Sequence, residues 1–376
     1  MVLYGGGGGN LYGELGVGST LSSFHDFIQI GSANNWKNIA PSDSFTIAQK
    51  NDNSIWGWGQ NDDFQMGNGT CCSDQLTPTL ISSATDWKMI AASGSRSAFA
   101  IKQNGTLWAW GSELSGLVGN DGSVHFPIQR HPDTDWDFIS AGKSHVLAIK
   151  TNRTLWSWGN NNWGETGTQV STQSIITQVD NSTWKTVAAG YQFSIGIKTD
   201  GTLWAWGWNN YGQLGLGNTT NMPFPTQIGT DNDWDKISAG RNHTVAQKTN
   251  GSIWVWGDNF YGQLGDGSST DGSTTPLYLA IDGCTLANES FSKETTNLVV
   301  TPNPLQNELT VNYKGDVTIN TIVIYDILGK IVYQSNPVAT TSLMATFPIT
   351  ELQSGTYTLV LKNNDTTVVS KKLVKD

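Results

Sequence analysis

The sequence is poor in charged residues and in long apolar runs, and each shortage excludes a class of protein. Charged residues make up 14% of the 376 residues, against roughly 25% in typical globular chains. The formal net charge is −10, so the chain lacks the clustered Lys and Arg expected of a nucleic-acid binder. No run of about eighteen apolar residues occurs, so we predict no transmembrane segment.

Cysteine is scarce, and the motifs of common catalytic and metal sites are missing. Cys71 and Cys72 are adjacent and Cys284 is distant, which matches no metal-ligand spacing. A disulfide from that pair to Cys284 is an alternative, but we favour free or buried thiols. The chain also lacks a phosphate-binding loop, a nucleophile elbow and a His-Glu-x-x-His motif. We therefore predict a protein that is not an enzyme and has no cofactor, metal or catalytic residue.

What the chain does have is a repeat of about fifty residues. Five full copies begin at tryptophan residues spaced 51, 49, 48 and 50 positions apart, namely Trp36, Trp87, Trp136, Trp184 and Trp234. An incomplete sixth copy covers Tyr4–Gly16. A fixed period of this length indicates an array of small units that bury their apolar faces only against one another.

Each copy reads as several short strands with both faces apolar. In the last copy, Asn250-Gly251 is a hairpin signal, and Ile253–Gly257 alternates aliphatic and tryptophan side chains across the two faces of a strand. Such a strand must be covered on both sides, as in a propeller blade. We predict an all-β protein with a β-propeller of about six to seven blades, incomplete at its N-terminus. A right-handed β-helix is the weaker alternative.

The order of motifs resembles a known family. The copy from Trp234 to Gly265 contains Ala-Gly-x-x-His, then Gly-x-Ile-x-x-Trp-Gly-x-Asn-x-x-Gly-Gln-Leu-Gly. This resembles the repeats of the regulator-of-chromosome-condensation family, over about residues 1–280. The resemblance implies a propeller over residues 1–284, and family members usually close a ring of seven blades.

Comparison of the copies distinguishes repeat positions that serve packing from variable positions on the surface. One position accepts Phe, Ser or His, which indicates packing rather than catalysis or metal binding: Phe45, Ser97, His145, Phe193 and His243. We also expect a structural role for the aromatic residue before the loop glycine, which recurs as Tyr12, Trp163, Tyr211 and Tyr261. Two other positions vary without pattern, one after Ala-Gly and one after Trp-Gly. Because recognition often lies on loops of a rigid scaffold, we predict partner contacts by Lys143, Tyr191, Trp208 and Arg241.

The last part of the chain differs. Residues 285–297 are polar and predict a linker, and residues 298–376 show alternating strands that predict a small antiparallel β-sandwich. The motifs Pro302-Asn303-Pro304, Ile324-Tyr325-Asp326, Gly329-Lys330 and Gly355-Thr356-Tyr357 occur in order before a Lys-rich end. They resemble the type A C-terminal sorting domain of the type IX secretion system of Bacteroidota. An ordinary adhesive sandwich is the alternative.

The resemblance of the tail implies export and a location outside the cell. It makes the type IX secretion machinery a partner of residues 298–376, and the protein would be secreted or held on the outer cell surface. The first residues show no basic region or long apolar stretch of a signal peptide, and Tyr4-Gly5 stands in the Trp-Gly position of a repeat. We therefore expect further residues before Met1.

Three functions were weighed. The favoured one is a non-catalytic binding protein whose propeller loops contact a protein or glycan at the cell surface. An extracellular polysaccharide-acting enzyme would need paired carboxylates, for which Asp43 and Asp258 are candidates that nothing singles out. Guanine-nucleotide exchange, as in eukaryotic relatives of the resembled family, is disfavoured by the acidic array and by the export domain.

Overall fold

The structure is a computed structural model that describes residues 5–20, 24–119, 122–169, 174–268, 272–279, 297–301, 307–326, 330–350, 352–364 and 366–375. The chain divides into two units, Met1–Ala287 and Asn288–Asp376. Within the described residues, regular structure is β-strand apart from the short 3-10 helix η1 (Leu114–Gly116). The predicted linker lies outside the described residues except for Asn297, as do Cys284 and the Pro302-Asn303-Pro304 motif.

Each full repeat forms one four-stranded antiparallel sheet whose strands pair in chain order. The first two sheets contain β3 (Trp36–Pro41), β4 (Phe45–Lys50), β5 (Ile55–Gly59) and β6 (Gln75–Ser82), then β7 (Trp87–Ala92), β8 (Ser97–Lys102), β9 (Leu107–Gly111) and β10 (Val124–Gln129). The third contains β11 (Trp136–Ala141), β12 (His145–Lys150), β13 (Leu155–Gly159) and β14 (Thr177–Gln178). The last two contain β15 (Trp184–Ala189), β16 (Phe193–Lys198), β17 (Leu203–Gly207) and β18 (Met222–Gln227), then β19 (Trp234–Ala239), β20 (His243–Lys248), β21 (Ile253–Gly257) and β22 (Ser273–Tyr278).

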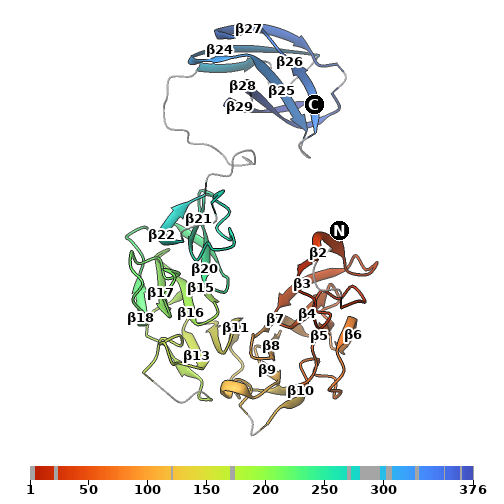
Figure 1. The fold of residues 1–376 in the computed structure, drawn as a ribbon, viewed down its shortest axis with the longest axis vertical. Coiled ribbons are helices and arrows are strands. Elements are labelled where there is room, and N and C mark those ends of the chain that lie inside the picture. Colours follow the sequence, from red (N-terminus) through yellow and green to blue (C-terminus); the bar gives the residue numbers. More distant parts are fainter. Residues whose placement is uncertain are drawn as a thin grey trace. The chain divides into compact units, whose positions relative to one another are not determined.

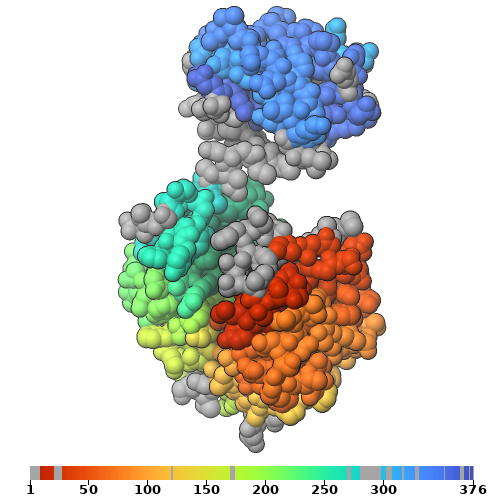
Figure 2. Space-filling view, turned by 45° about the vertical axis from the view of Figure 1, so that its right-hand side comes forward, coloured from red at the N-terminus to blue at the C-terminus, as the bar shows by residue number. Residues whose placement is uncertain are grey.

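These sheets are the blades of a propeller, as the repeat predicted. The first strand of each blade contacts the first strand of the next, so β3, β7, β11, β15 and β19 lie along the inner side. The blades follow one another in an arc from red to teal (Figure 1), and they form successive sectors in the space-filling view (Figure 2). We number them one to five.

A hydrogen bond from a tryptophan indole joins each full blade to the loop of the blade before it. The indole Nε1 of Trp206 donates to the carbonyl oxygen of Glu165 at 3.0 Å, and that of Trp256 donates to Gln213 at 2.9 Å. Both side chains are completely buried, and each buried indole removes roughly 200 Å² from water, worth about 5 kcal/mol. Trp58, Trp110 and Trp158 make the same bond to the loops before them. The tryptophan of the recurring Trp-Gly motif therefore stabilises the contact between neighbouring blades.

The incomplete first copy folds as part of a blade. Its strands β1 (Gly5–Gly8) and β2 (Phe24–Gln29) form a two-stranded sheet. The loop between them repeats the conformation of the full copies, because Asn10 Oδ1 accepts from the amide of Leu15 at 3.0 Å. The carbonyl of Glu14 then accepts from Trp58. The described residues thus form five full blades and part of another blade.

The C-terminal unit is a β-sandwich of two sheets. One sheet has the order β23 (Asn297–Thr301), β24 (Glu308–Ile319) and β27 (Thr340–Pro348). The other has the order β26 (Ile331–Ser335), β25 (Thr321–Asp326), β28 (Gly355–Asn363) and β29 (Thr366–Lys375). Leu309, Tyr313, Ile322 and Leu359 are fully buried in its core. Alternation of these apolar side chains with exposed polar ones is why the tail forms a sandwich.

The cysteine prediction was wrong. Cys71 and Cys72 are bonded to each other, rather than free or linked to Cys284. Cys72 has a positive φ of 64°, and its amide donates to the carbonyl of Asn61 at 3.0 Å. This turn brings the neighbouring sulfur atoms together, and spacing along the sequence does not reveal such a turn.

Candidate binding surface

The two variable positions of the repeat lie on the same face of the propeller. One belongs to the inner loop between the first and second strands of a blade, the other to the residue after Trp-Gly. In the fourth blade the amide of Trp208 donates to the carbonyl of Gln192 at 2.9 Å, directly beside Tyr191. The other full blades make the equivalent bond at 2.7–3.0 Å through Gln60, Ser112, Asn160 and Asp258.

Glycine is required where these two loops meet. Gly207 has a φ of +99°, and a Cβ there would lie 2.8 Å from the carbonyl oxygen of Gln192. A side chain at this position would force the strand end away from the inner loop. The recurring glycine therefore holds the two variable loops together on one face.

The inner loops are also bonded from blade to blade. The amide of Ser95 donates to the carbonyl of Lys143 at 2.7 Å, and the amide of Lys143 donates to Gly190 at 3.3 Å. These bonds fix the positions of successive inner-loop side chains relative to one another. Because the backbone is held on both sides, the side chains project from a rigid support.

Three of the four predicted contact residues meet on this support. The Lys143 ammonium nitrogen lies 4.2 Å from the centre of the Tyr191 ring and donates a hydrogen bond to its hydroxyl. The Arg241 guanidinium carbon lies 4.6 Å from the centre of the same ring. Side chains from blades three, four and five thus converge on one aromatic ring. Nothing in the sequence relates these residues except their common place in the repeat.

The fourth predicted residue lies beside this group. The Trp208 ring packs edge-on against Tyr211, with ring centres 5.4 Å apart and an interplanar angle of 83°. Trp208 is partly exposed, and its backbone is bonded next to Tyr191 as described above. It therefore adds an aromatic surface adjoining the cationic group.

The two cations of this group, Lys143 and Arg241, make no ion pair among the described residues, although Asp258 lines the same cavity as Arg241. Lys150 and Lys248, by contrast, each pair with two aspartates. Two like charges near one ring gain from cation–π contact but keep their demand for a counter-ion. We name Lys143, Tyr191 and Arg241 the cationic triad.

The histidine position serves packing between blades. His145 is fully buried, and its Nε2 lies 2.9 Å from Ser194 Oγ. Ser194 Oγ donates to the carbonyl of Glu165 at 2.7 Å, so it accepts from His145. Burial lowers the pKa of His145 to about 3, and burial lowers the pKa of His243 as well, which a Coulombic effect of Asp258 opposes. In the described part of the chain no cluster of three or more His, Cys, Asp or Glu could hold a metal ion.

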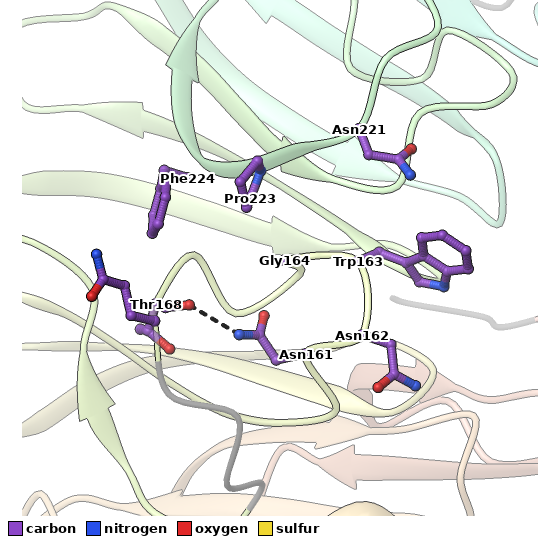
Figure 3. Close-up of a pocket in the computed structure, with 9 residues that line it drawn as sticks. Asn161, Asn162, Trp163, Gly164, Thr168, Asn221, Pro223 and Phe224 are labelled. Atoms are coloured by element: carbon purple, nitrogen blue, oxygen red, sulfur yellow. Dashed lines mark hydrogen bonds between the residues drawn. The ribbon is translucent and has the colours of Figure 1, made fainter.

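The aromatic residue before the loop glycine is exposed to differing degrees. The exposed fractions are 37%, 42%, 46% and 85% at Tyr12, Trp163, Tyr211 and Tyr261, and the structural role expected for this position stays a prediction. The sequence shows only that they recur and not that they face outward. Two cavities lie beside them. One, of about 540 Å³, adjoins Trp163 (Figure 3). The other, of about 820 Å³, adjoins Tyr211, Tyr261 and Arg241.

The fold defines a class: a β-propeller of repeated four-stranded blades, followed by a β-sandwich. The sequence matches the profile of the RCC1-like domain over residues 3–304, and the chain belongs to this family. Residues 299–376 match the secretion system C-terminal sorting domain. This domain marks the protein for type IX export to the outer cell surface or the medium and implies contact with the type IX secretion machinery. Among the described residues no helix has the length and apolar character needed to cross a membrane.

Solved structures share the propeller fold. Human WBSCR16 superposes with a TM-score of 0.65 at 17% identity, over 83% of this chain and 87% of that chain. Prp20p from Saccharomyces cerevisiae superposes with a TM-score of 0.51 at 18% identity, over 74% and 87% of the two chains. Identities this low establish the fold and leave the function open.

Proposed function

We propose that this secreted or surface-held protein is a non-catalytic binding protein whose inner loops contact a protein or glycan that carries an acidic group. The observation that carries the proposal is the cationic triad, in which Lys143 and Arg241 flank Tyr191 without a carboxylate partner among the described residues. A carboxylate or sulfate on the partner would supply the missing counter-charge. Arg241 is exposed and Lys143 partly so, so a macromolecule can reach both.

The chemistry of the triad favours recognition over catalysis. Lysine and arginine hydrogen-bond and attract an anion, whereas Tyr191 and Trp208 offer flat surfaces that gain from burial at an interface. Neither hydrolysis nor nucleotide exchange is needed to explain a group of this composition. Asp43 and Asp258, the carboxylates considered for a polysaccharide-acting enzyme, belong to the first and fifth blades, and no observation favours that function.

The test measures binding of the full chain to acidic probes. We expect immobilised protein to bind polygalacturonate, dextran sulfate or poly-glutamate, and the affinity to fall as salt is raised. Lys143→Ala combined with Arg241→Ala should weaken binding at least tenfold, and Tyr191→Ala should weaken it less.

Lys236→Ala is the matched control, because Lys236 is an exposed lysine on β19 outside the triad. It should bind like the wild type. Equal loss in the control and in the double variant would mean that binding depends on overall charge, and the proposal would fail. Failure of all three acidic probes would also reject it.

A further inference from the structure

The cavity beside Trp163 lies where the loop of the third blade crosses the outer strand of the fourth. Its walls come from the loop around Asn161–Gln169 and from the start of β18 (Figure 3). Gly164 makes the crossing possible, because a Cβ there would lie 2.2 Å from the Cα of Pro223. The cavity is separate from the cationic triad, which is built from the inner loops.

The lining combines aromatic surface with amide groups and contains no ionisable side chain. Trp163 and Phe224 are 42% and 44% exposed. Asn162 and Gln169 contribute amides that can both donate and accept. The Oδ1 of Asn221 accepts from the amide of Asn209 at 2.8 Å, which leaves its Nδ2 without an acceptor among the described residues. The described residues that line this cavity are therefore all uncharged, although the chain carries a net negative charge.

The equivalent place between blades one and two shows which side chains can fit where a loop crosses the next outer strand. Val124 and Met222 pair with the equivalent glycines Gly111 and Gly207, so the next residues, His125 and Pro223, occupy equivalent places on the outer strands. In the interface between blades one and two, the ring of Phe64 stacks on His125, with centres 3.6 Å apart and planes inclined by 17°. There the chain places its own flat ring at the junction.

The interface between blades three and four lacks this pair of stacked rings. Gly164 replaces Phe64 and Pro223 replaces His125, so neither ring of the stack is present. Trp163, on the same loop, makes no ring contact with any other described residue, and its ring projects away from Phe224, on the side of Asn162 and Asn221 (Figure 3). The junction therefore offers an aromatic surface, a cavity of about 540 Å³ and the side-chain amides of Asn162 and Asn221.

We propose that this cavity binds a neutral sugar residue of a polysaccharide. The apolar C–H face of a pyranose ring packs against the Trp163 indole, and its hydroxyl groups hydrogen-bond to the amides of Asn162 and Asn221, which project on the same side of the loop (Figure 3). Uncharged hydroxyls suit amide partners, while a carboxylate or phosphate would lose its hydration without gaining a cation. The site goes beyond the acidic partner proposed for the triad, since it selects a different chemistry with different residues.

The experiment is isothermal titration of the full chain with defined hexasaccharides. The probes are cellohexaose, xylohexaose, mannohexaose and maltohexaose, with hexagalacturonate as the acidic counterpart. We expect at least one neutral hexasaccharide to bind, and we expect hexagalacturonate to bind more weakly than it in the Lys143→Ala/Arg241→Ala double variant, which lacks the cations of the triad. Trp163→Ala should weaken the neutral ligand about tenfold or more, Trp163→Phe should retain most of the affinity, and Asn162→Ala should weaken it by a smaller factor.

Tyr261→Ala is the matched control. Tyr261 occupies the same position of the repeat and is 85% exposed but lies outside this cavity. It should leave neutral-sugar binding unchanged, as should the double variant of Lys143 and Arg241, which separates this proposal from the preceding one. Absence of binding by every neutral hexasaccharide at millimolar concentration would overturn the proposal. So would a Trp163→Ala protein that binds like the wild type, or a preference for hexagalacturonate in the Lys143→Ala/Arg241→Ala double variant.

Discussion

The interfaces between consecutive full blades differ from the face of the fifth blade that no described blade covers, although the repeat sequence is nearly the same. In the third blade Leu147 and Ile149 are completely buried, whereas their equivalents Val245 and Gln247 in the fifth blade are partly exposed. A Cβ on Gly215 would lie 2.7 Å from Trp256 Nε1, but a Cβ on Gly265 would meet no atom within 4 Å.

The loop conformation is nevertheless the same in both places. Asn209 Oδ1 accepts from Leu214 at 3.0 Å, and Asn259 Oδ1 accepts from Leu264 at 3.0 Å. Gly215 and Gly265 have φ values of +72° and +67°. The loop is thus determined by its own residues, while the burial of the blade face comes from the neighbouring blade. The following variants test this separation.

The largest effect is expected for Gly215→Ala. The positive φ costs about 1 kcal/mol for any L-residue, and the contact with Trp256 adds about 2–3 kcal/mol of overpacking. Gly265→Ala carries the same φ cost without the contact, so it should lose only about 1 kcal/mol. Urea unfolding followed by tryptophan emission measures the difference, because all 17 tryptophans belong to the propeller. Equal losses in the two variants would contradict the comparison.

Glu165→Gln should stabilise the covered interface above neutral pH. Glu165 is fully buried, and burial raises its pKa from 4.5 to about 7. The folded state therefore holds the proton more tightly than the unfolded state, and stability is lost as the pH rises from about 4.5 through 7. The glutamine that other copies carry at this position avoids this loss.

We expect Glu165→Gln to gain about 2–3 kcal/mol at pH 8 and nothing at pH 4. Gln213→Glu, at the equivalent buried position of the next blade, is the reciprocal variant and should destabilise the protein at pH 8. A gain in Glu165→Gln that does not change between pH 4 and pH 8 would show that the carboxylate is not responsible.

His145→Phe should reduce the sensitivity of the protein to acid. With its pKa lowered by burial to about 3, His145 stays neutral in the folded state while the unfolded residue takes up a proton below about 6.5. Stability is therefore lost as the pH falls from 6.5 toward 3, by about 2 kcal/mol at pH 5. Phe193 occupies this position in the fourth blade without a titrating group.

Urea midpoints at pH 7 and pH 5 measure this change. The loss between the two pH values should shrink in His145→Phe, and it should shrink less in His243→Phe, because His243 is only partly buried. An equal response of the two histidines would indicate that the fifth blade is covered in solution.

The smallest effect is expected for Lys185→Ala. Lys185 Nζ lies 2.6 Å from Asp235 Oδ1 and joins blades four and five, but both side chains are more than one-third exposed. Exposed pairs contribute little because water and salt screen them. We expect a urea midpoint indistinguishable from that of the wild type. A clear shift that disappears at 1 M salt would show that the interface relies on charge rather than packing.

Much of the fold was predictable because the repeat makes the same local structure many times. The fifty-residue period predicted the blades, the Asn250-Gly251 pair predicted a hairpin, and alternation in the tail predicted the sandwich. The candidate surface was only partly predictable. Variation between copies identified Lys143, Tyr191 and Arg241 as a set, but their convergence depends on how three blades pack.

Other features had no usable signal. The bond between Cys71 and Cys72 depends on a left-handed turn at Cys72, and adjacency along the chain does not predict that turn. The exposure of Trp163 had no signal in the sequence, because recurrence in a repeat does not distinguish a buried side chain from an exposed one. The cavity beside it is also lined by Pro223 and Phe224 of the next blade, which lie about sixty positions further along the sequence than Trp163.

The sequence by itself determined the conformation of each blade and loop, since hairpin glycines, asparagine-bonded loops and apolar alternation act between residues close in the chain. It also determined the destination of the protein, because each motif of the sorting domain consists of residues adjacent in the chain. Tertiary structure alone decided which blade faces are dry, which charges lack partners and where a cavity opens. Those properties arise between blades, where burial, Coulombic attraction and ring stacking depend on residues that only packing brings together.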